Sequence, residues 1–330
     1  MAADRAVTPE HVRDVILADH DRRNRQNGNW TVTPIGKARE SWLFKAHTPL
    51  APWPLAVKVF SSAMPVALPA RQHTALRHYH AAMAGRPDLT VPVPWGVLPE
   101  HRTLIMEWID APRLDKLLRR AVRRPERNRL IAAAGRWLRH FHDQGEQTLR
   151  PVKDIDLLRP VDTLLGGEGG ENARNPVFRA ACGILRDRLH EFADTRIALV
   201  TSHGDFSPAN LFLDERRTVG FDFKANTARP TAHDMLHFLV HAKSFTTSPW
   251  MLLTSRVDEH DLDAFVSGYG ALDAGMNARL LSVFRLAEAL HSWAYLIARV
   301  RREGMSARRF VRALHLRAIA SDASRRLEQD

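Results

Sequence analysis

Short runs rich in aromatic and β-branched residues, separated by glycine, proline and charged turns, occupy much of the first third of the chain. Runs of this length and composition are typical of β-strands rather than helices. We therefore expect strands at residues 30–36, 41–46, 55–60, 95–98 and 103–109.

Outside these runs, apolar residues recur at the spacing of a helix. Thr8 followed by Pro9 is a typical helix start, because threonine caps free amide groups and proline fits the first turn. Residues 131–142 carry an apolar stripe of period three to four. Besides the N-terminal helix, we expect helices at 70–76, 114–122, 131–142, 178–192, 262–269 and within 280–326.

Composition is that of a large folded protein. The 330 residues are 45% hydrophobic and 26% charged, enough to bury one or two full cores. Cys182 is the only cysteine, so no internal disulfide forms, and no apolar run approaches the roughly 18 residues of a membrane span. The first residues lack the order of a secretory signal, so we expect a cytoplasmic protein without a membrane partner.

A net charge of +11 raises the hypothesis of a nucleic-acid partner. The arginines are spread along most of the chain, often at helical spacing with acidic residues between them. No zinc-ligand spacing or aromatic RNA-binding strand accompanies them. We therefore expect solvated helix faces and no nucleic-acid partner.

The strongest chemical signal is an H-x-D-x-x-x-x-N sequence that ends at Asn210. Two short expected strands, 211–213 and 219–223, follow it and form a hairpin that carries Asp222. In phosphoryl transfer from ATP, an aspartate orients the acceptor hydroxyl, and an asparagine and a second aspartate hold magnesium. Asp205, Asn210 and Asp222 have this order and spacing.

These residues resemble the aminoglycoside phosphotransferase and choline kinase-like family. The resemblance implies an α+β, bilobal protein kinase-like fold, with a small β-rich N-lobe at 1–109 and a mostly helical C-lobe at 110–330. It implies ATP and Mg²⁺ as cofactors, Asp205 as catalytic base, and Asn210 and Asp222 as magnesium ligands. The expected function is ATP-dependent phosphorylation of a small-molecule hydroxyl.

Lys58 interrupts the apolar strand 55–60. A buried ammonium is costly without an anion, so Lys58 either has an anionic partner or faces water from an edge strand. In the family this lysine contacts the α and β phosphates and pairs with a glutamate on the next helix. Residues 60–86 contain no acidic residue, and Gln72 stands where that glutamate would be. Either a neutral Gln72 suffices, or the protein is a weakened kinase.

The strand 103–109 ends in an apolar-to-polar change that resembles the family's adenine-binding hinge. The resemblance implies that main-chain groups of Glu107 to Ile109 contact adenine and that Met106 forms an apolar wall. The alternative is that Met106 is an ordinary core residue.

Several polar residues near the motif have expected supporting roles. We assign His142 to structural hydrogen bonding, and Asp234 to capping and loop support. Lys224 follows the magnesium ligand Asp222, where many aminoglycoside-modifying members are acidic. It disfavours a polycationic acceptor and favours a neutral or anionic one.

Two other functions compete. A set of His203, Asp205, His233, Asp234 and His237 suits a transition-metal phosphohydrolase, because His233 and His237 lie one helical turn apart. Gln72 favours a non-catalytic nucleotide-binding regulator. A Walker-type NTPase is disfavoured, because the chain has no phosphate-loop sequence and its glycine cluster at 166–170 contains a glutamate.

Overall fold

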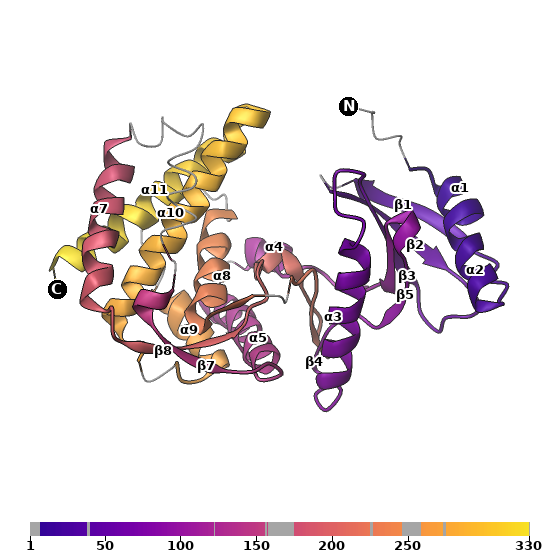
Figure 1. Cartoon of the computed structure of the whole chain (residues 1–330), viewed down its shortest axis with the longest axis horizontal. Coiled ribbons are helices and arrows are strands. Elements are labelled where there is room, and N and C mark those ends of the chain that lie inside the picture. The colour runs from indigo at the N-terminus through magenta and orange to yellow at the C-terminus, as the bar shows by residue number, and fades with distance from the viewer. Residues whose placement is uncertain are drawn as a thin grey trace. The chain divides into compact units, whose positions relative to one another are not determined.

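The computed structural model describes residues 7–37, 40–121, 123–155, 157, 175–224, 227–245, 259–272 and 275–329 (Figure 1). The glycine cluster lies outside these residues. The chain divides into two compact units, the first of Met1–Ala111 with Phe212–Lys224, the second of Pro112–Leu211 with Ala225–Asp330. The two lobes expected from the sequence, 1–109 and 110–330, are each one continuous segment. The observed first unit instead combines two segments, because it also includes Phe212–Lys224.

The first unit is built on a five-stranded antiparallel sheet of order β1-β2-β3-β6-β5. All five expected strands are confirmed, and β6 ends two residues earlier than expected. The strand bounds are β1 Thr31–Lys37, β2 Ser41–His47, β3 Leu55–Phe60, β5 Pro94–Leu98 and β6 Thr103–Glu107.

The two faces of this sheet have different partners. On one face Val57 and Ile105 pack in a core with Ile16 from the N-terminal helical segment, which comprises α1 Pro9–His11, a π-helical stretch Val12–Leu17 and α2 Ala18–Asn24. Thr8 accepts a hydrogen bond from His11 N–H, so the expected helix start is confirmed. Because strand side chains alternate, Lys58 points to the opposite face, towards α3 Leu68–Ala82.

A second small sheet in the first unit has the order β4-β10-β9. It comprises β4 Leu89–Thr90, β9 Leu211–Leu213 and β10 Thr218–Gly220, with β10 parallel to β4. The expected strand 219–223 is therefore wrong at its C-terminal end. Asp222 has a φ of +60°, a left-handed conformation that cannot continue a strand.

The second unit is mostly helical. Its helices are α4 Leu114–Arg120, α5 Arg124–His142, α7 Pro176–Glu191, α8 Thr231–Phe245, α9 Glu259–Tyr269, α10 Ala278–Glu303 and α11 Ala307–Gln329. A small sheet of order β11-β8-β7 accompanies them, with β7 Thr148–Pro151, β8 Arg196–Thr201 and β11 Ala228–Pro230. No helix in the described segments has the length and apolar character needed to cross a membrane.

Candidate active site

Lys58 has an anionic partner in the first unit. Its Nζ donates a hydrogen bond to Asp222 Oδ1 at 2.7 Å, and its side chain is only 16% exposed. Strand β3 lies between β2 and β6, so the hypothesis of a water-facing edge-strand lysine is wrong. The partly buried ammonium is instead neutralised by a carboxylate 164 positions further along the chain.

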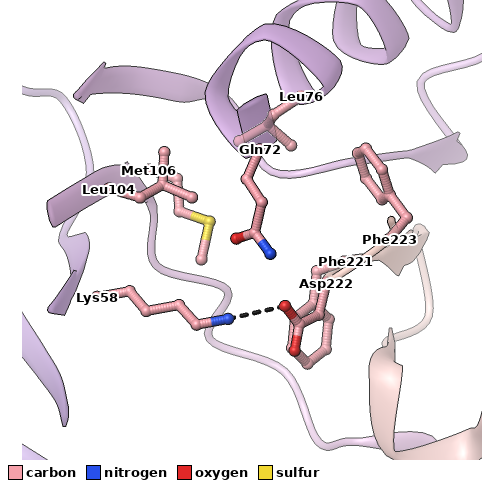
Figure 2. A pocket seen from close by; sticks show the side chains of 8 residues that line it. All are labelled: Lys58, Gln72, Leu76, Leu104, Met106, Phe221, Asp222 and Phe223. Carbon is pink, nitrogen blue, oxygen red and sulfur yellow. Dashed lines mark hydrogen bonds and ion pairs between the residues drawn. The ribbon is translucent and has the colours of Figure 1, made fainter. Parts of the chain in front are cut away.

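A pocket surrounds this ion pair, and Figure 2 shows the Gln72 amide pointing into it from α3. No hydrogen bond joins Gln72 to Lys58 within the described part of the chain. Met106 lies on the pocket wall beside Leu104. The full lining is Lys58, Gln72, Leu76, Leu104, Met106, Phe221, Asp222 and Phe223.

Aromatic contacts fix the strained segment that carries Asp222. Phe221 stacks on Phe212 with ring centroids 4.8 Å apart, and Phe223 packs edge-on against Tyr79 at 5.2 Å. A left-handed conformation is unfavourable for an aspartate and persists only where its surroundings impose it. The two flanking rings provide that restraint and hold the carboxylate towards the pocket.

Glu107 is occupied within the protein. Its amide N–H donates to the Val93 carbonyl at 2.8 Å, and its buried carboxylate accepts hydrogen bonds from Arg217 at 2.8 Å and from Val93 N–H at 3.1 Å. The Trp108 N–H donates to the Pro54 carbonyl. Of the three amide groups expected at the adenine hinge, only that of Ile109 has no acceptor among the described residues.

In the second unit, buried Asp234 organises the loop that follows β8. Its carboxylate accepts hydrogen bonds from His203 N–H at 2.7 Å and from the Ser202 hydroxyl at 2.9 Å. His142 bonds Asp234 through Nε2 and the Tyr269 hydroxyl through Nδ1. Burial opposes ionisation, but His142 holds the pKa of Asp234 well below its usual range. The loop support expected of Asp234 and the structural hydrogen bonding expected of His142 are confirmed.

The same loop presents Asp205 and Asn210. Asn210 Nδ2 donates to the Asp205 carbonyl at 2.9 Å, so the Asn210 side-chain oxygen is left to act as a ligand. The Asp205 side chain is 44% exposed and accessible to an acceptor. His203 is fully buried, with its ring packed against those of Trp137, Phe141 and Phe206.

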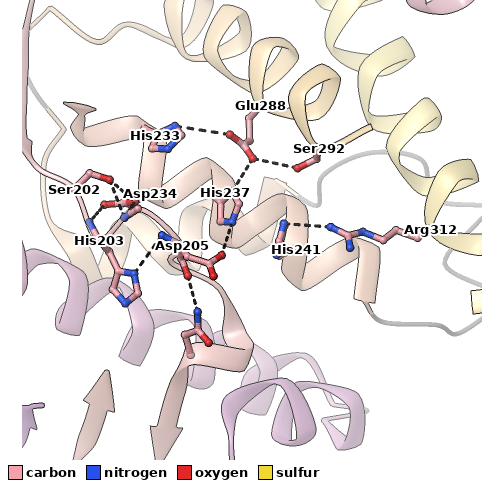
Figure 3. A network of polar contacts seen from close by, with 12 residues as sticks. Ser202, His203, Asp205, His233, Asp234, His237, His241, Glu288, Ser292 and Arg312 are labelled. Carbon is pink, nitrogen blue, oxygen red and sulfur yellow. Dashed lines mark hydrogen bonds and ion pairs between the residues drawn. The ribbon is translucent and has the colours of Figure 1, made fainter. Parts of the chain in front are cut away.

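One residue that lies beside Asp205 was not predicted at this position. His237 Nε2 lies 3.4 Å from Asp205 Oδ1, and its Nδ1 lies 2.7 Å from Glu288 Oε1 (Figure 3). The sequence placed His237 only in the metal-hydrolase hypothesis. Its one-turn spacing from His233 was visible, but its contact with a glutamate 51 residues away depends on tertiary structure.

The described residues do not bring the histidine and aspartate set of the metal-hydrolase hypothesis together as one group of ligands. Among the described residues, only one group of three or more His, Cys, Asp or Glu side chains has its ligand atoms close together. This group is Asp19, Glu100 and His101. Asp19 is neutralised by two neighbouring arginines. His233 and His237 instead face Glu288.

Oxygen donors suited to Mg²⁺ are present in each unit: the Asp222 carboxylate in the first, and the Asn210 amide oxygen in the second. The ammonium group on Asp222 shows that this carboxylate is placed to receive a cation. The chemistry of each of these two donors fits a magnesium ion.

Solved structures share this fold. A choline/ethanolamine kinase family protein from Mesorhizobium loti is similar with a TM-score of 0.61 at 14% identity, over 91% of this chain and 93% of that one. An amicoumacin kinase bound to AMP-PNP and Ca²⁺ gives 0.57 at 12% identity, over 89% and 88%. A spectinomycin phosphotransferase bound to ADP and spectinomycin gives 0.54 at 12% identity, over 89% and 93%. The α+β protein kinase-like fold expected from the sequence is confirmed.

No curated protein matches the chain. A family model does: that of the phosphotransferase enzyme family matches residues 31–281, more than half of the chain. The match includes Lys58, Asp205, Asn210 and Asp222. The chain therefore belongs to the phosphotransferase enzyme family.

Proposed function

We propose that this protein transfers the γ-phosphoryl group of ATP to a hydroxyl group of a small molecule. The observation that carries the proposal is the Lys58–Asp222 ion pair on the wall of the first unit's pocket. It brings a phosphate-binding cation and a metal-binding carboxylate together across 164 residues. An apolar wall that includes Met106 and Leu104 suits a nucleobase beside them.

Each residue has one role in this reaction. Lys58 orients the phosphates; Asp222 and Asn210 would hold Mg²⁺, which would supply neutralisation of charge on the phosphate oxygens. Asp205 accepts a hydrogen bond from the acceptor hydroxyl. The acceptor oxygen bonds to the γ-phosphorus as the bond from phosphorus to the ADP oxygen breaks, and the hydroxyl proton passes to Asp205.

The acceptor is neutral or anionic rather than polycationic. Lys224 is exposed two residues after Asp222, and His237 places an imidazole beside Asp205. The similar structures include spectinomycin and amicoumacin phosphotransferases, but at 12% identity they define only the fold. We place the reaction in the cytoplasm, where ATP and Mg²⁺ are available.

The test is a phosphorylation screen of metabolite pools with ATP and Mg²⁺, followed by Asp205→Asn. We expect one acceptor to gain the mass of a phosphate group. Asp205→Asn should lower turnover by about 10²- to 10⁴-fold while ATP affinity is unchanged, because the carboxylate acts only on the attacking hydroxyl. Asp143→Asn is the matched control, since Asp143 is a half-exposed carboxylate paired with Arg139.

A nucleotide-binding regulator is the second candidate, favoured by the neutral Gln72 on the wall of the pocket that holds Lys58. ATP binding without phosphorylation of any acceptor and without ATP hydrolysis would support it. Wild-type turnover in Asp205→Asn would contradict the role of Asp205.

A further inference from the structure

His237 lies between two carboxylates from different parts of the second unit. Its Nε2 lies 3.4 Å from Asp205 Oδ1 in the loop after β8, and its Nδ1 lies 2.7 Å from Glu288 Oε1 on α10 (Figure 3). With a proton on each nitrogen, the ring donates a hydrogen bond to Glu288 through Nδ1 and forms an ion pair with Asp205 through Nε2. One side chain on α8 thus connects the exposed proposed base to a buried anion.

At the other end of these contacts, Glu288 is buried and held by a second hydrogen bond. The Glu288 side chain is only 4% exposed, and its Oε1 also accepts a hydrogen bond from the Ser292 hydroxyl one turn along α10. A carboxylate buried this deeply requires a cation. Burial opposes the imidazolium, but Glu288 and then Asp205 raise the pKa of His237 to about 10. His237 therefore carries its charge at neutral pH.

The next histidine on α8 is neutral. The His241 ring lies one turn beyond His237, with ring centroids 4.1 Å apart. Arg312 Nη2 lies 3.3 Å from His241 Nε2, and a guanidinium only donates, so this nitrogen is an acceptor. Burial and the charge of His237 hold the pKa of His241 well below its usual value. The titratable and charged groups around the pair are Asp205, His233, Glu288, His291 and Arg312.

We infer that His237 is a positioning residue for Asp205, held in place by Glu288. His237 fixes one carboxylate oxygen of Asp205, and the second oxygen is thereby left to accept the acceptor's hydroxyl. The inference rests on the proposed function, because it assigns His237 to the same reaction. Fixing a reacting group is catalytically valuable, since a misplacement of about 1 Å costs on the order of 10²-fold in rate.

Two substitutions separate the two contacts of the ring. Glutamine places an amide near the position of the histidine Nε2, so His237→Gln keeps a donor to Asp205. Asparagine places one near Nδ1, so His237→Asn keeps only the donor to Glu288. His190→Gln on α7 is the matched control, because His190 is exposed and outside this chain of contacts.

The rate to measure is turnover of Mg·ATP, with water as acceptor until the acceptor is known. We expect His237→Asn to lower kcat by about 10- to 100-fold with the KM for ATP within about twofold of wild type. His237→Gln should recover most of that loss. Equal kcat values in wild type, His237→Asn and His237→Gln would overturn the inference.

A second measurement does not depend on activity. Histidine side-chain ¹⁵N NMR reports the protonation of His237 across a pH titration. Asp205→Asn should lower the pKa of His237, and Glu288→Gln should lower it further. An unchanged pKa in Asp205→Asn would overturn the contact even if phosphoryl transfer is found. A lowered pKa in a protein that transfers no phosphate would overturn the proposed function while the contact stands.

Discussion

Gln72 and Lys58 line the same pocket, yet the lysine donates to Asp222 instead. The interaction occupies the carboxylate that the proposed reaction assigns to Mg²⁺. A second carboxylate on α3 would share the ammonium and leave Asp222 freer to bind the metal. The residue at position 72 should therefore set how readily the pocket accepts Mg·ATP.

We expect Gln72→Glu to preserve ATP use or to lower the KM for ATP. Gln72→Leu should raise that KM by about 2- to 10-fold, because it removes a polar group that faces the ion pair. Steady-state kinetics in ATP measure both effects, with Gln26→Glu as control, since Gln26 is exposed in the same unit. Wild-type values for both Gln72 variants would show that this side chain does not influence Lys58.

How far single residues can be predicted depends on how local their contacts are. The proximity of Asp205 and Asn210 could be predicted because five residues of loop fix their relation, and the Asn210–Asp205 hydrogen bond spans that interval. The need of Lys58 for an anion followed from its apolar strand. Its partner, Asp222, was named as a metal ligand but not as the anion, because no sequence spacing encodes a contact across 164 residues.

Elements were predicted well where their period was clear. The strands of the five-stranded sheet were placed within two residues, because alternation and turn residues bound each of them. The prediction of a strand at 219–223 was wrong at its C-terminal end. Phe221 and Phe223 have strand-like composition, but their rings pack against Phe212 and Tyr79, and Asp222 between them has a left-handed conformation.

Close packing of α5 and α9 requires two glycines. A Cβ at Gly268 would overlap the Ala132 main-chain oxygen, and one at Gly135 would overlap that of Phe265. We expect Gly268→Ala and Gly135→Ala each to lower the free energy of unfolding by about 1 to 3 kcal/mol or more.

The matched control for these glycines lies on α7. A Cβ at Gly183 meets no atom within 4 Å, so Gly183→Ala should stabilise the protein by about 0.5 to 1 kcal/mol through helix propensity. Urea denaturation of the three variants measures the difference. Equal effects at all three positions would contradict close helix contact as the cause.

The pairing of α8 with α10 through His237 and Glu288 makes stability depend on pH. The pKa of His237 is raised to about 10 from an unfolded value near 6.5, so its contribution is complete below about pH 6.5 and is lost as pH rises through 10. The pKa of Glu288 is lowered to about 2, so its contribution is present above about pH 4.3 and is lost as pH falls.

We therefore expect the stability difference between wild type and His237→Gln to be largest between about pH 4.3 and 6.5, and to shrink steadily towards pH 10. Urea unfolding of both proteins at several pH values provides the measurement. Taking the difference between their free energies of unfolding cancels the contributions of other titrating groups. A difference that stays constant from pH 6 to pH 10 would show that His237 is neutral in the folded protein.

At the scale of the whole molecule, the proposed reaction draws on both units. Lys58 and Asp222 belong to the first, and Asp205, Asn210 and His237 belong to the second. The motif spacing indicated Asp205, Asn210 and Asp222, the apolar strand and the family resemblance indicated Lys58, and neither indicated this role for His237. The motif spacing also did not predict that Phe212–Lys224 returns to the first unit, because the hairpin after Asn210 gives no sign of which core it joins.

Because of this division, we expect the substitution of Asp222 in the first unit to affect nucleotide binding. We expect the substitution of Asp205 in the second unit to affect turnover. A ligand present at 100 times its Kd stabilises the folded state by about 2.7 kcal/mol, which raises Tm by several degrees in a protein of this size. Mg·ATP should therefore raise the Tm of wild type and of Asp205→Asn by the same amount. Asp222→Ala should lose that shift, because it removes both a metal ligand and the partner of Lys58.

The measurement is thermal unfolding with and without Mg·ATP, repeated with EDTA to remove the metal. Asp214→Ala provides a control on the same segment, since Asp214 is exposed and caps only the turn at Arg216 and Arg217. EDTA should reduce the wild-type shift to the level of Asp222→Ala. A full, EDTA-sensitive shift in Asp222→Ala would assign the metal to other residues, and its loss in Asp205→Asn would make Asp205 a nucleotide-binding group rather than the base.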